Sequence, residues 1–219
     1  MNVVQLLVLA KEPAPGRVKT RLCPPFTPQE ASWLAEAALA DTLDAVSRTP
    51  AARRVLALDG EPDDWLVPGL EVIPQRGEGL DERLAAAFDD AGGPSILIGM
   101  DTPQVTRGIL LDATALLSSP GTDAVLGAAR DGGWWAIGLR CPDPRVFLGV
   151  PMSSPSTCAA QQRRLDALGL RWVPLAELRD VDRLEDAHAV AAAAPRSRFA
   201  NALRELVQRE PVAAGGVAR

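Results

Sequence analysis

Lysine is nearly absent from this 219-residue chain, although basic residues as a class are not. Lysine and arginine together number 23, and only Lys11 and Lys19 are lysines. Both lie within residues 10–22, which also contain Arg17 and Arg21. Chance placement would put both lysines among these four basic positions with a probability of about 0.02. Because an ammonium group is a compact, mobile charge that suits a phosphate oxygen, the segment predicts phosphate contact.

Histidine and cysteine are also scarce. The single histidine, His188, falls inside a predicted helix, and Cys23, Cys141 and Cys158 are odd in number and widely spaced. This set provides no ligand spacing for zinc and no basis for a disulfide framework. We therefore expect a protein of the reducing cytoplasm.

The chain has no excess of basic residues and no long hydrophobic run. Its formal net charge is -5, which argues against a general nucleic-acid-binding protein, because such a protein needs a broad basic face. The apolar segment 1–10 lacks the basic n-region of a signal peptide and is too short to span a bilayer, so we expect a buried strand and no membrane insertion. A hydrophobic content of 47% with 23% charged residues is typical of globular proteins.

Two common catalytic motifs are missing. The basic segment does not have the Gly-x-x-x-x-Gly-Lys-Ser/Thr spacing of a Walker A loop. No Gly-x-Ser-x-Gly sequence is present, so the chain lacks the nucleophile elbow of α/β hydrolases.

Strand-like and helix-like patterns alternate along the chain, which predicts an α/β fold with a doubly wound sheet. There is no internal repeat and no interdomain linker, so we expect one domain over 1–209 and a disordered Ala/Gly-rich tail over 210–219. The predicted strands are 3–10, 54–58, 71–74, 95–99, 123–128, 134–139 and 171–174, and the predicted helices are 28–46, 80–91, 105–117, 156–168, 182 onward and 197–208.

Several polar segments adjoin the ends of these strands, where ligands bind in such sheets. In the first, Gly16 and the nearby Lys11, Lys19 and Arg21 are suited to surround a di- or triphosphate, or else form a solvated turn. In the second, Asp101 follows a buried strand, and it either holds Mg²⁺ or Mn²⁺ or caps the next helix.

Two further segments carry aspartates. In 131–135, Gly132 and Gly133 permit close backbone approach and Trp134 can stack on a ligand; the alternative is a hairpin turn with core tryptophans. In 180–182, we expect Asp182 to cap a helix that has Glu185 at its third position. That assignment leaves Asp180 as a second metal carboxylate or as an exposed turn residue.

These segments, in this order, resemble a bacterial family of arsenosugar-biosynthesis-type glycosyltransferases, also classed as a domain of unknown function. The family belongs to the GT-A-like nucleotide-diphospho-sugar transferase superfamily. The stretches that carry the resemblance are Ala10-Lys-x-Pro-x-Pro-Gly-x-Val-Lys-Thr-Arg-Leu22, Gln75-x-Gly-x-x-Leu-x-Glu-Arg-Leu84, Gly99-x-Asp-Thr-Pro103, Asp131-Gly-Gly-Trp-Trp-x-Ile-Gly-Leu139 and Asp180-Val-Asp182. The chain differs from the family pattern at Glu78-Gly79, at Arg183-Leu184 and around 154–158.

The resemblance implies a GT-A-like, Rossmann-like three-layer sandwich, with a mostly parallel central sheet and helices on both faces. It implies Mg²⁺ or Mn²⁺ on Asp101 and Asp180, catalytic roles for Lys19, Arg21 and Asp131, and an acceptor site at Gly132, Gly133 and Trp134. The nucleotide-binding residues that it implies are Ala10, Lys11, Pro13, Gly16, Val18, Lys19, Thr20, Arg21, Arg76, Gly77 and Arg83.

The function implied is that of a metal-assisted transferase, with a nucleotide-sugar glycosyltransferase as the leading hypothesis. The first loop is also similar to that of guanylyltransferases that activate phospholactate or phosphoenolpyruvate, so nucleotidyl transfer to a small phosphorylated acceptor is the alternative. A non-catalytic nucleotide-binding module is a third. The expected partners are a nucleotide sugar or nucleoside triphosphate and a small-molecule acceptor. Acceptor identity, base preference, stereochemistry and oligomeric state stay open.

Overall fold

A seven-stranded sheet forms the centre of the computed structural model, which describes residues 4–209. The strand order is β3-β2-β1-β4-β6-β5-β7, and β6 runs antiparallel to its neighbours β4 and β5 while the other pairs are parallel. The strands are β1 (Gln5–Lys11), β2 (Arg54–Asp59), β3 (Glu71–Pro74), β4 (Ser95–Gly99), β5 (Ala124–Ala128), β6 (Trp134–Leu139) and β7 (Trp172–Pro174).

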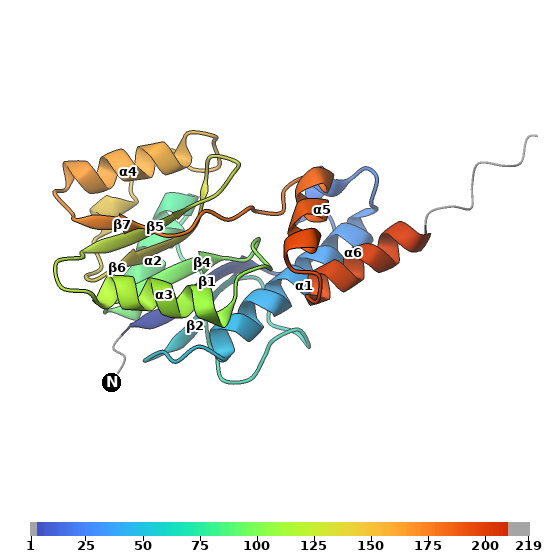
Figure 1. The fold of residues 1–219 in the computed structure, drawn as a ribbon, viewed down its shortest axis with the longest axis horizontal. Coiled ribbons are helices and arrows are strands. Elements are labelled where there is room, and N and C mark those ends of the chain that lie inside the picture. The colour runs from blue at the N-terminus through green and yellow to red at the C-terminus, as the bar shows by residue number, and fades with distance from the viewer. Residues whose placement is uncertain (1–3, 210–219) are drawn as a thin grey trace, which may run out of the picture.

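Helices cover both faces of this sheet (Figure 1). Helices α1 (Pro28–Ser47) and α3 (Arg107–Ser118) pack on one face, and α2 (Leu80–Ala91) and α4 (Thr157–Ala167) pack on the other. Helices α5 (Leu184–Ala193) and α6 (Arg198–Arg209) pack against α1 at one end of the molecule. The predicted three-layer α/β fold with a mostly parallel sheet is confirmed.

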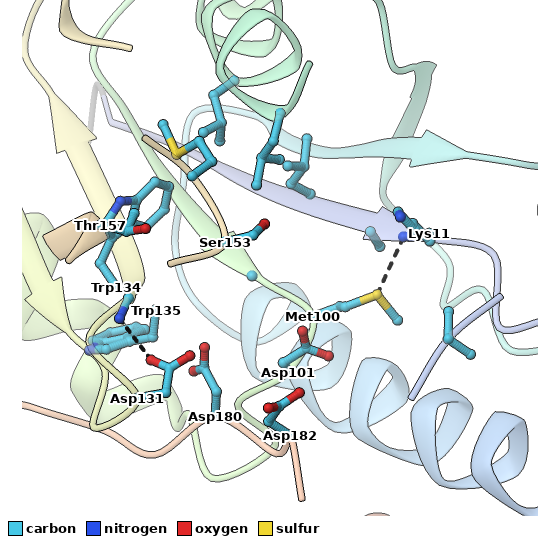
Figure 2. Close-up of a pocket in the computed structure, with 18 of the residues that line it drawn as sticks. Lys11, Met100, Asp101, Asp131, Trp134, Trp135, Ser153, Thr157, Asp180 and Asp182 are labelled. Carbon is cyan, nitrogen blue, oxygen red and sulfur yellow. Dashed lines mark hydrogen bonds between the residues drawn. The ribbon is translucent and has the colours of Figure 1, made fainter. Parts of the chain in front are cut away.

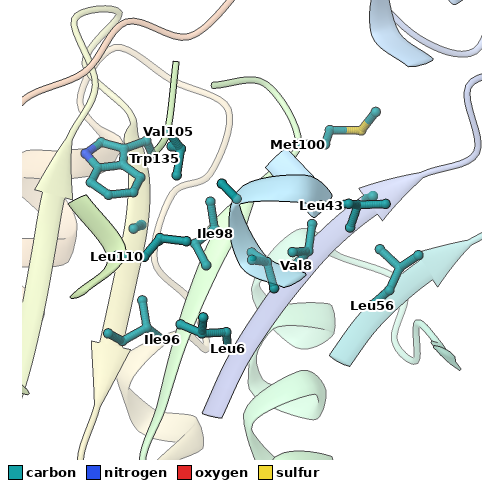
Figure 3. Packing of buried hydrophobic residues seen from close by; sticks show 14 of the residues in the cluster. Leu6, Val8, Leu43, Leu56, Ile96, Ile98, Met100, Val105, Leu110 and Trp135 are labelled. Carbon is teal, nitrogen blue, oxygen red and sulfur yellow. The ribbon is translucent and has the colours of Figure 1, made fainter. Parts of the chain in front are cut away.

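The side chains of β1 explain why both faces need a helical layer. Leu6 and Val8 pack toward α1 and α3, and Leu7 packs toward α2. All three are fully buried, as expected for a central strand covered on both sides, and Figure 3 shows Leu6 and Val8 within one of the two core layers. Burying each such side chain contributes about 1.5–3 kcal/mol.

The sequence predicted the caps of two helices, and the structure confirms one and corrects the other. The capping box of α1 is present: Thr27 Oγ1 accepts from the Glu30 backbone N–H at 3.3 Å, and the Glu30 carboxylate accepts from the Thr27 N–H at 2.8 Å. The cap predicted for α5 is wrong. The cap is Arg183, because the Asp186 carboxylate at the third helical position accepts the Arg183 backbone N–H at 2.9 Å, while the carboxylate of Asp182 pairs with Arg21.

The strand directions bring the predicted polar segments to one edge. Strands β1 and β4 are adjacent and parallel, with Leu9 paired to Gly99, so the basic loop and the Asp101 segment leave the sheet side by side. Strand β6 is antiparallel and therefore begins at that edge, which places Trp134 there. Within residues 4–209, no helix combines the length and apolarity needed to cross a membrane. The predicted tail, 210–219, lies outside the described residues.

Candidate active site

A cavity of about 940 Å³ opens at this edge, between the basic loop after β1 and the segments that flank β6. Figure 2 shows its side chains, with four aspartates along one side and Lys11 and Trp134 at opposite ends. The predicted site residues that line it are Ala10, Lys11, Val18, Lys19, Thr20, Arg21, Arg83, Asp101, Asp131, Gly133, Trp134 and Asp180.

Pro13, Gly16, Arg76, Gly77 and Gly132 do not line this cavity. The Arg76 guanidinium turns away to Asp90, with Nη2 and Oδ1 2.6 Å apart. Pro13 offers only its carbonyl, which accepts from Ser32 Oγ at 2.6 Å. Gly16, Gly77 and Gly132 instead supply backbone turns, with φ of 77°, 113° and 90°, where other residues are strained.

Lys19 does not extend freely into the cavity. Its backbone is left-handed, with φ 51° and ψ 32°, and its side chain is only 7% exposed. The ammonium group forms an ion pair with Asp101 and donates a hydrogen bond to the Val181 carbonyl. The Val181 N–H in turn donates to the Asp101 carbonyl at 2.9 Å. The basic loop, the end of β4 and the segment 180–182 are therefore joined at one point.

The other cations of the loop differ in their partners. Arg21 Nη1 lies 2.8 Å from Asp182 Oδ2, which adds a second link between the loop and 180–182. The Lys11 side chain is exposed and has no hydrogen bond or ion pair among the described residues, while its backbone N–H donates to Met100 Sδ at 3.3 Å. Lys11 is thus available to a ligand without breaking an existing contact.

Asp180 is the most perturbed group of the site. Its Oδ1 atom is buried and has no hydrogen-bond partner. Burial, together with the nearby carboxylates of Asp101 and Asp131, raises the pKa of Asp180 to about 8, although Lys19 acts in the opposite direction. The aspartates therefore repel one another in the absence of a further cation.

Asp101, Asp131, Asp180 and Asp182 form one side of the cavity, which we call the acidic side. This side fits a divalent ion that also binds the substrate. No group of three aspartate, glutamate, histidine or cysteine side chains within residues 4–209 forms a ready metal cage. Mg²⁺, however, is commonly held by one or two carboxylates together with substrate phosphates. The unpartnered oxygen of Asp180 and the carboxylate of Asp101 provide such a pair.

Residues 152–157 are a part of the site that the sequence did not identify. Met152, Ser153, Ser154 and Thr157 line the cavity, just before and at the start of α4, and Figure 2 shows Ser153 and Thr157 across from Asp101 and Asp182. Thr157 Oγ1 accepts from the Ser154 N–H at 3.1 Å, which holds the segment in its turn. The available signal was a cluster of serines and a threonine at a helix start.

Gly132 packs directly against residues 152–157. A Cβ at Gly132 would lie 2.0 Å from the Pro155 carbonyl oxygen, and the Gly132 carbonyl accepts from the Cys158 N–H at 2.8 Å. Asp131 Oδ1 accepts from the Gly133 N–H at 2.8 Å, which closes the turn. The predicted acceptor loop and segment 152–157 are thus fitted against each other.

Gln75 also contributes to the site, although only its place in the motif indicated it. Its Nε2 donates to the Ala10 carbonyl at 2.7 Å and to the Ala57 carbonyl at 3.0 Å. Arg83 Nη1 lies 2.8 Å from Asp59 Oδ2. Both residues therefore hold the ends of β1, β2 and β3 together beside the cavity.

Comparison with known proteins identifies a family and relatives that match parts or most of the chain. Residues 42–154 match the family described as "Uncharacterized protein conserved in bacteria (DUF2064)". The chain is 32% identical to 3-phospho-D-glycerate guanylyltransferase of Phenylobacterium zucineum over 206 residues, which are 87% of this chain and 92% of that protein. It is 33% identical to 2-phospho-L-lactate guanylyltransferase of Haloarcula marismortui, but this match spans 58% of the chain and only 59% of that relative.

Solved structures agree with the fold. A protein from Desulfovibrio desulfuricans G20, assigned as a nucleotide-diphospho-sugar transferase, superposes with a TM-score of 0.84 and 27% identity over 95% of this chain and 96% of that one. Glucosyl-3-phosphoglycerate synthase of Mycobacterium tuberculosis, solved with Mn²⁺ and UDP, has a TM-score of 0.52 and 15% identity over 99% and 82% of the two chains, a likeness of fold alone. This chain therefore belongs to the DUF2064 family and is a transferase with the nucleotide-diphospho-sugar transferase fold.

Proposed function

We propose that this protein is a nucleotidyltransferase that transfers a nucleoside monophosphate from a nucleoside triphosphate to a small phosphorylated acid. The observation that carries the proposal is the meeting of Lys19 and Arg21 with Asp101 and Asp180 in one cavity. Cations and carboxylates in this arrangement suit a triphosphate and its divalent ion. The relative that aligns over nearly its full length is a guanylyltransferase, which favours nucleotidyl over glycosyl transfer.

In this reaction, an oxygen of the acceptor phosphate attacks the α-phosphorus. The bond between the α-phosphorus and the bridging oxygen breaks, and pyrophosphate leaves with that oxygen and its electron pair. Mg²⁺ or Mn²⁺ on Asp101 and Asp180 supplies neutralisation of the phosphate charge when it is bound. The protein's own task is to orient the two substrates and to stabilise negative charge, and one well-placed donor is typically worth about 10²–10³ in rate.

Lys19 and Arg21 would contribute by binding the phosphates of the nucleotide. Each is paired with an aspartate, Lys19 with Asp101 and Arg21 with Asp182. With Asp101 holding a divalent ion, Lys19 would turn toward the β- and γ-phosphates, and the exposed Arg21 would reach the same phosphates from its place beside Asp182. Ala10, Lys11, Val18 and Thr20 line the same part of the cavity and would contact the nucleotide.

The acceptor would lie between Trp134 and the hydroxyls of 153–157, on the far side of the aspartates. Asp131, exposed and hydrogen-bonded to the Gly133 N–H, would keep the loop 131–133 in place there. Through this loop Asp131 would help to position the acceptor.

Glycosyl transfer is the second candidate, favoured by the 0.84 TM-score to a protein assigned as a nucleotide-diphospho-sugar transferase. In that reaction the sugar–phosphate bond breaks, and a nucleoside diphosphate leaves in place of pyrophosphate. The same phosphate and ion positions serve both reactions, so the product distinguishes them.

The test is to incubate the enzyme and Mg²⁺ or Mn²⁺ with each nucleoside triphosphate and 3-phosphoglycerate or 2-phospholactate. Pyrophosphate release that requires the acceptor is the expected result. Release of a nucleoside diphosphate from a nucleotide sugar, without pyrophosphate formation from triphosphates, would establish the glycosyl alternative. Thermal stabilisation by nucleotides with neither product would identify a non-catalytic nucleotide-binding module.

A further inference from the structure

The loop between β3 and α2 forms a separate wall of the cavity. Leu80 and Leu84 line it, together with Leu9 from β1, and Leu80 is 39% exposed although it is large and apolar. Glu78 lies in the same loop and also lines the cavity. The other acidic residues that line the cavity, within the described chain, are Asp101, Asp131, Asp180 and Asp182, and they belong to other segments. Glu78 is therefore a carboxylate on a wall that Leu9, Leu80 and Leu84 share with Gln75 and Arg83.

The backbone on both sides of Glu78 is fixed. Its own N–H donates to Glu82 Oε2 at 2.8 Å, and Arg83 Nε donates to the Gly77 carbonyl at 3.2 Å. The Arg83 N–H donates to the Gly79 carbonyl at 3.0 Å. Gly77 has φ 113°, and a Cβ there would lie 2.6 Å from Glu82 Cβ. The loop thus holds Glu78 at a defined place before any ligand arrives.

The Glu78 carboxylate has no partner of its own. Neither an ion pair nor a hydrogen bond to its oxygens occurs among residues 4–209, whereas the neighbouring polar side chains are all engaged. Gln75 binds two carbonyls, Glu82 binds the Glu78 N–H, and Arg83 binds Asp59. Glu78 alone in this loop offers two adjacent, unused acceptor oxygens to a ligand.

The sheet order indicates which part of a nucleotide meets this wall. Strands β3, β2 and β1 lie in the order of a mononucleotide-binding half, with β4 across the switch point, and ligands bind in the crevice outside the carboxyl ends of such strands. With the phosphates beside Lys19, the nucleoside extends over that half, away from Trp134 and 152–157. The base then reaches the wall of Leu9, Leu80 and Leu84.

We propose that Glu78 recognises guanine by accepting hydrogen bonds from its N1–H and its 2-amino group. This inference rests on the proposed function, because it assumes a nucleotide in the cavity. Guanine presents two adjacent donors on this edge, which match the two oxygens of one carboxylate. Adenine, cytosine and uracil each present at least one acceptor there, which would face the carboxylate unpaired. The leucines contact the flat faces of the base.

The experiment compares GDP, IDP and ADP binding by isothermal titration calorimetry with Mg²⁺, for the wild-type protein and Glu78→Gln. IDP differs from GDP only in lacking the 2-amino group. The wild type should bind GDP at least about tenfold more tightly than IDP or ADP, as expected for a bidentate base contact. In Glu78→Gln that preference should fall to about twofold or less. Glu185→Gln, an exposed glutamate on α5, is the matched control and should retain the wild-type preference.

Two results would overturn the assignment. One is an unchanged GDP preference in Glu78→Gln. The other is an equal loss for GDP, IDP and ADP that disappears with 2′,3′-dideoxynucleotides, which would place the carboxylate on the ribose. Nucleotide binding without a base preference would contradict the role of Glu78 only. Failure of every nucleotide to bind would instead contradict the proposed function itself.

Discussion

The two sides of the cavity are built on opposite electrostatic principles. On the acidic side, burial, together with the nearby carboxylates of Asp101 and Asp131, raises the pKa of Asp180 to about 8. On the wall that carries Glu78, which we call the base side, the Glu78 carboxylate has no charged partner among residues 4–209, and hydrogen bonds within its loop hold its backbone. The carboxylates of the acidic side repel one another until a cation besides Lys19 binds, whereas the base side has its shape before a ligand binds. Metal and phosphate binding should therefore be coupled to rearrangement, and base binding should not.

The largest expected effect comes from removing the carboxylate common to the ion and to Lys19. Asp101→Asn should abolish measurable Mn²⁺ binding and lower the transferase rate about 10³-fold or more, because charge on the leaving phosphate is no longer neutralised. Mn²⁺ binding is measured by electron paramagnetic resonance and the rate by pyrophosphate release.

Asp112→Asn is the control for this change, since Asp112 is an exposed aspartate on α3 with no partner among the described residues. It should leave both quantities unchanged. If Asp101→Asn retained Mn²⁺ binding, the acidic side would not be the metal site and the comparison between the two sides would fail.

A smaller effect is expected at the lysine that bridges the acidic side. Lys19→Ala should weaken binding of a nucleoside diphosphate about 10–100-fold, as expected for loss of a charge-assisted contact. The same variant should bind Mn²⁺ several-fold more tightly without nucleotide, because the ammonium group no longer competes for Asp101. Calorimetry and Mn²⁺ titration measure the two opposite shifts.

Lys11→Ala provides the matched comparison, because Lys11 lies in the same basic segment, at the end of β1, but has no ion pair among residues 4–209. It should weaken nucleotide binding less than Lys19→Ala and leave Mn²⁺ affinity unchanged. Equal, small effects of both variants on nucleotide binding would show that the basic loop does not hold the phosphates.

The smallest expected effect is on stability as a function of pH. The folded pKa of Asp180, about 8, lies above the ordinary value of 3.8, so the folded protein retains a proton that the unfolded chain releases. Metal-free protein should therefore lose stability as the pH rises from about 4 to 8. Asp180→Asn cannot titrate, and it should be more stable than the wild type at pH 7 by about 1–3 kcal/mol.

Urea unfolding in the presence of EDTA at pH 5, 6, 7 and 8 measures this difference. The gain in Asp180→Asn should increase with pH over this range, while Asp112→Asn should follow the wild type. A constant difference between Asp180→Asn and the wild type would show that the carboxyl of Asp180 does not titrate in this window.

The fold could be predicted from the sequence because its signals are local. The apolar run of β1, the capping box of Thr27 and Glu30, and the alternation of strands and helices each lie within a few residues of one another. The base-side loop 75–84 is similarly contiguous, and its motif was visible. Local patterns also placed Asp101 directly after a buried strand.

The structure of the acidic side could be predicted only in part, because it depends on contacts between residues that are far apart in the sequence. Arg21 and Asp182 are 161 residues apart, so no local pattern indicates that Asp182 pairs with Arg21 while Arg183 caps α5. The engagement of Lys19 with Asp101 and Val181 likewise has no local signal. The role of 152–157 depends on the antiparallel placement of β6, which periodicity alone does not specify.

The close fit of Gly132 against Pro155 has a consequence for how the acceptor range of this family can change. The two loops leave no room for a side chain between them, so neither can be lengthened or reshaped while the other stays the same. Homologues with different acceptors should therefore differ in 131–133 and 152–157 together. An attempt to transplant acceptor specificity between family members should exchange both loops as a single cassette.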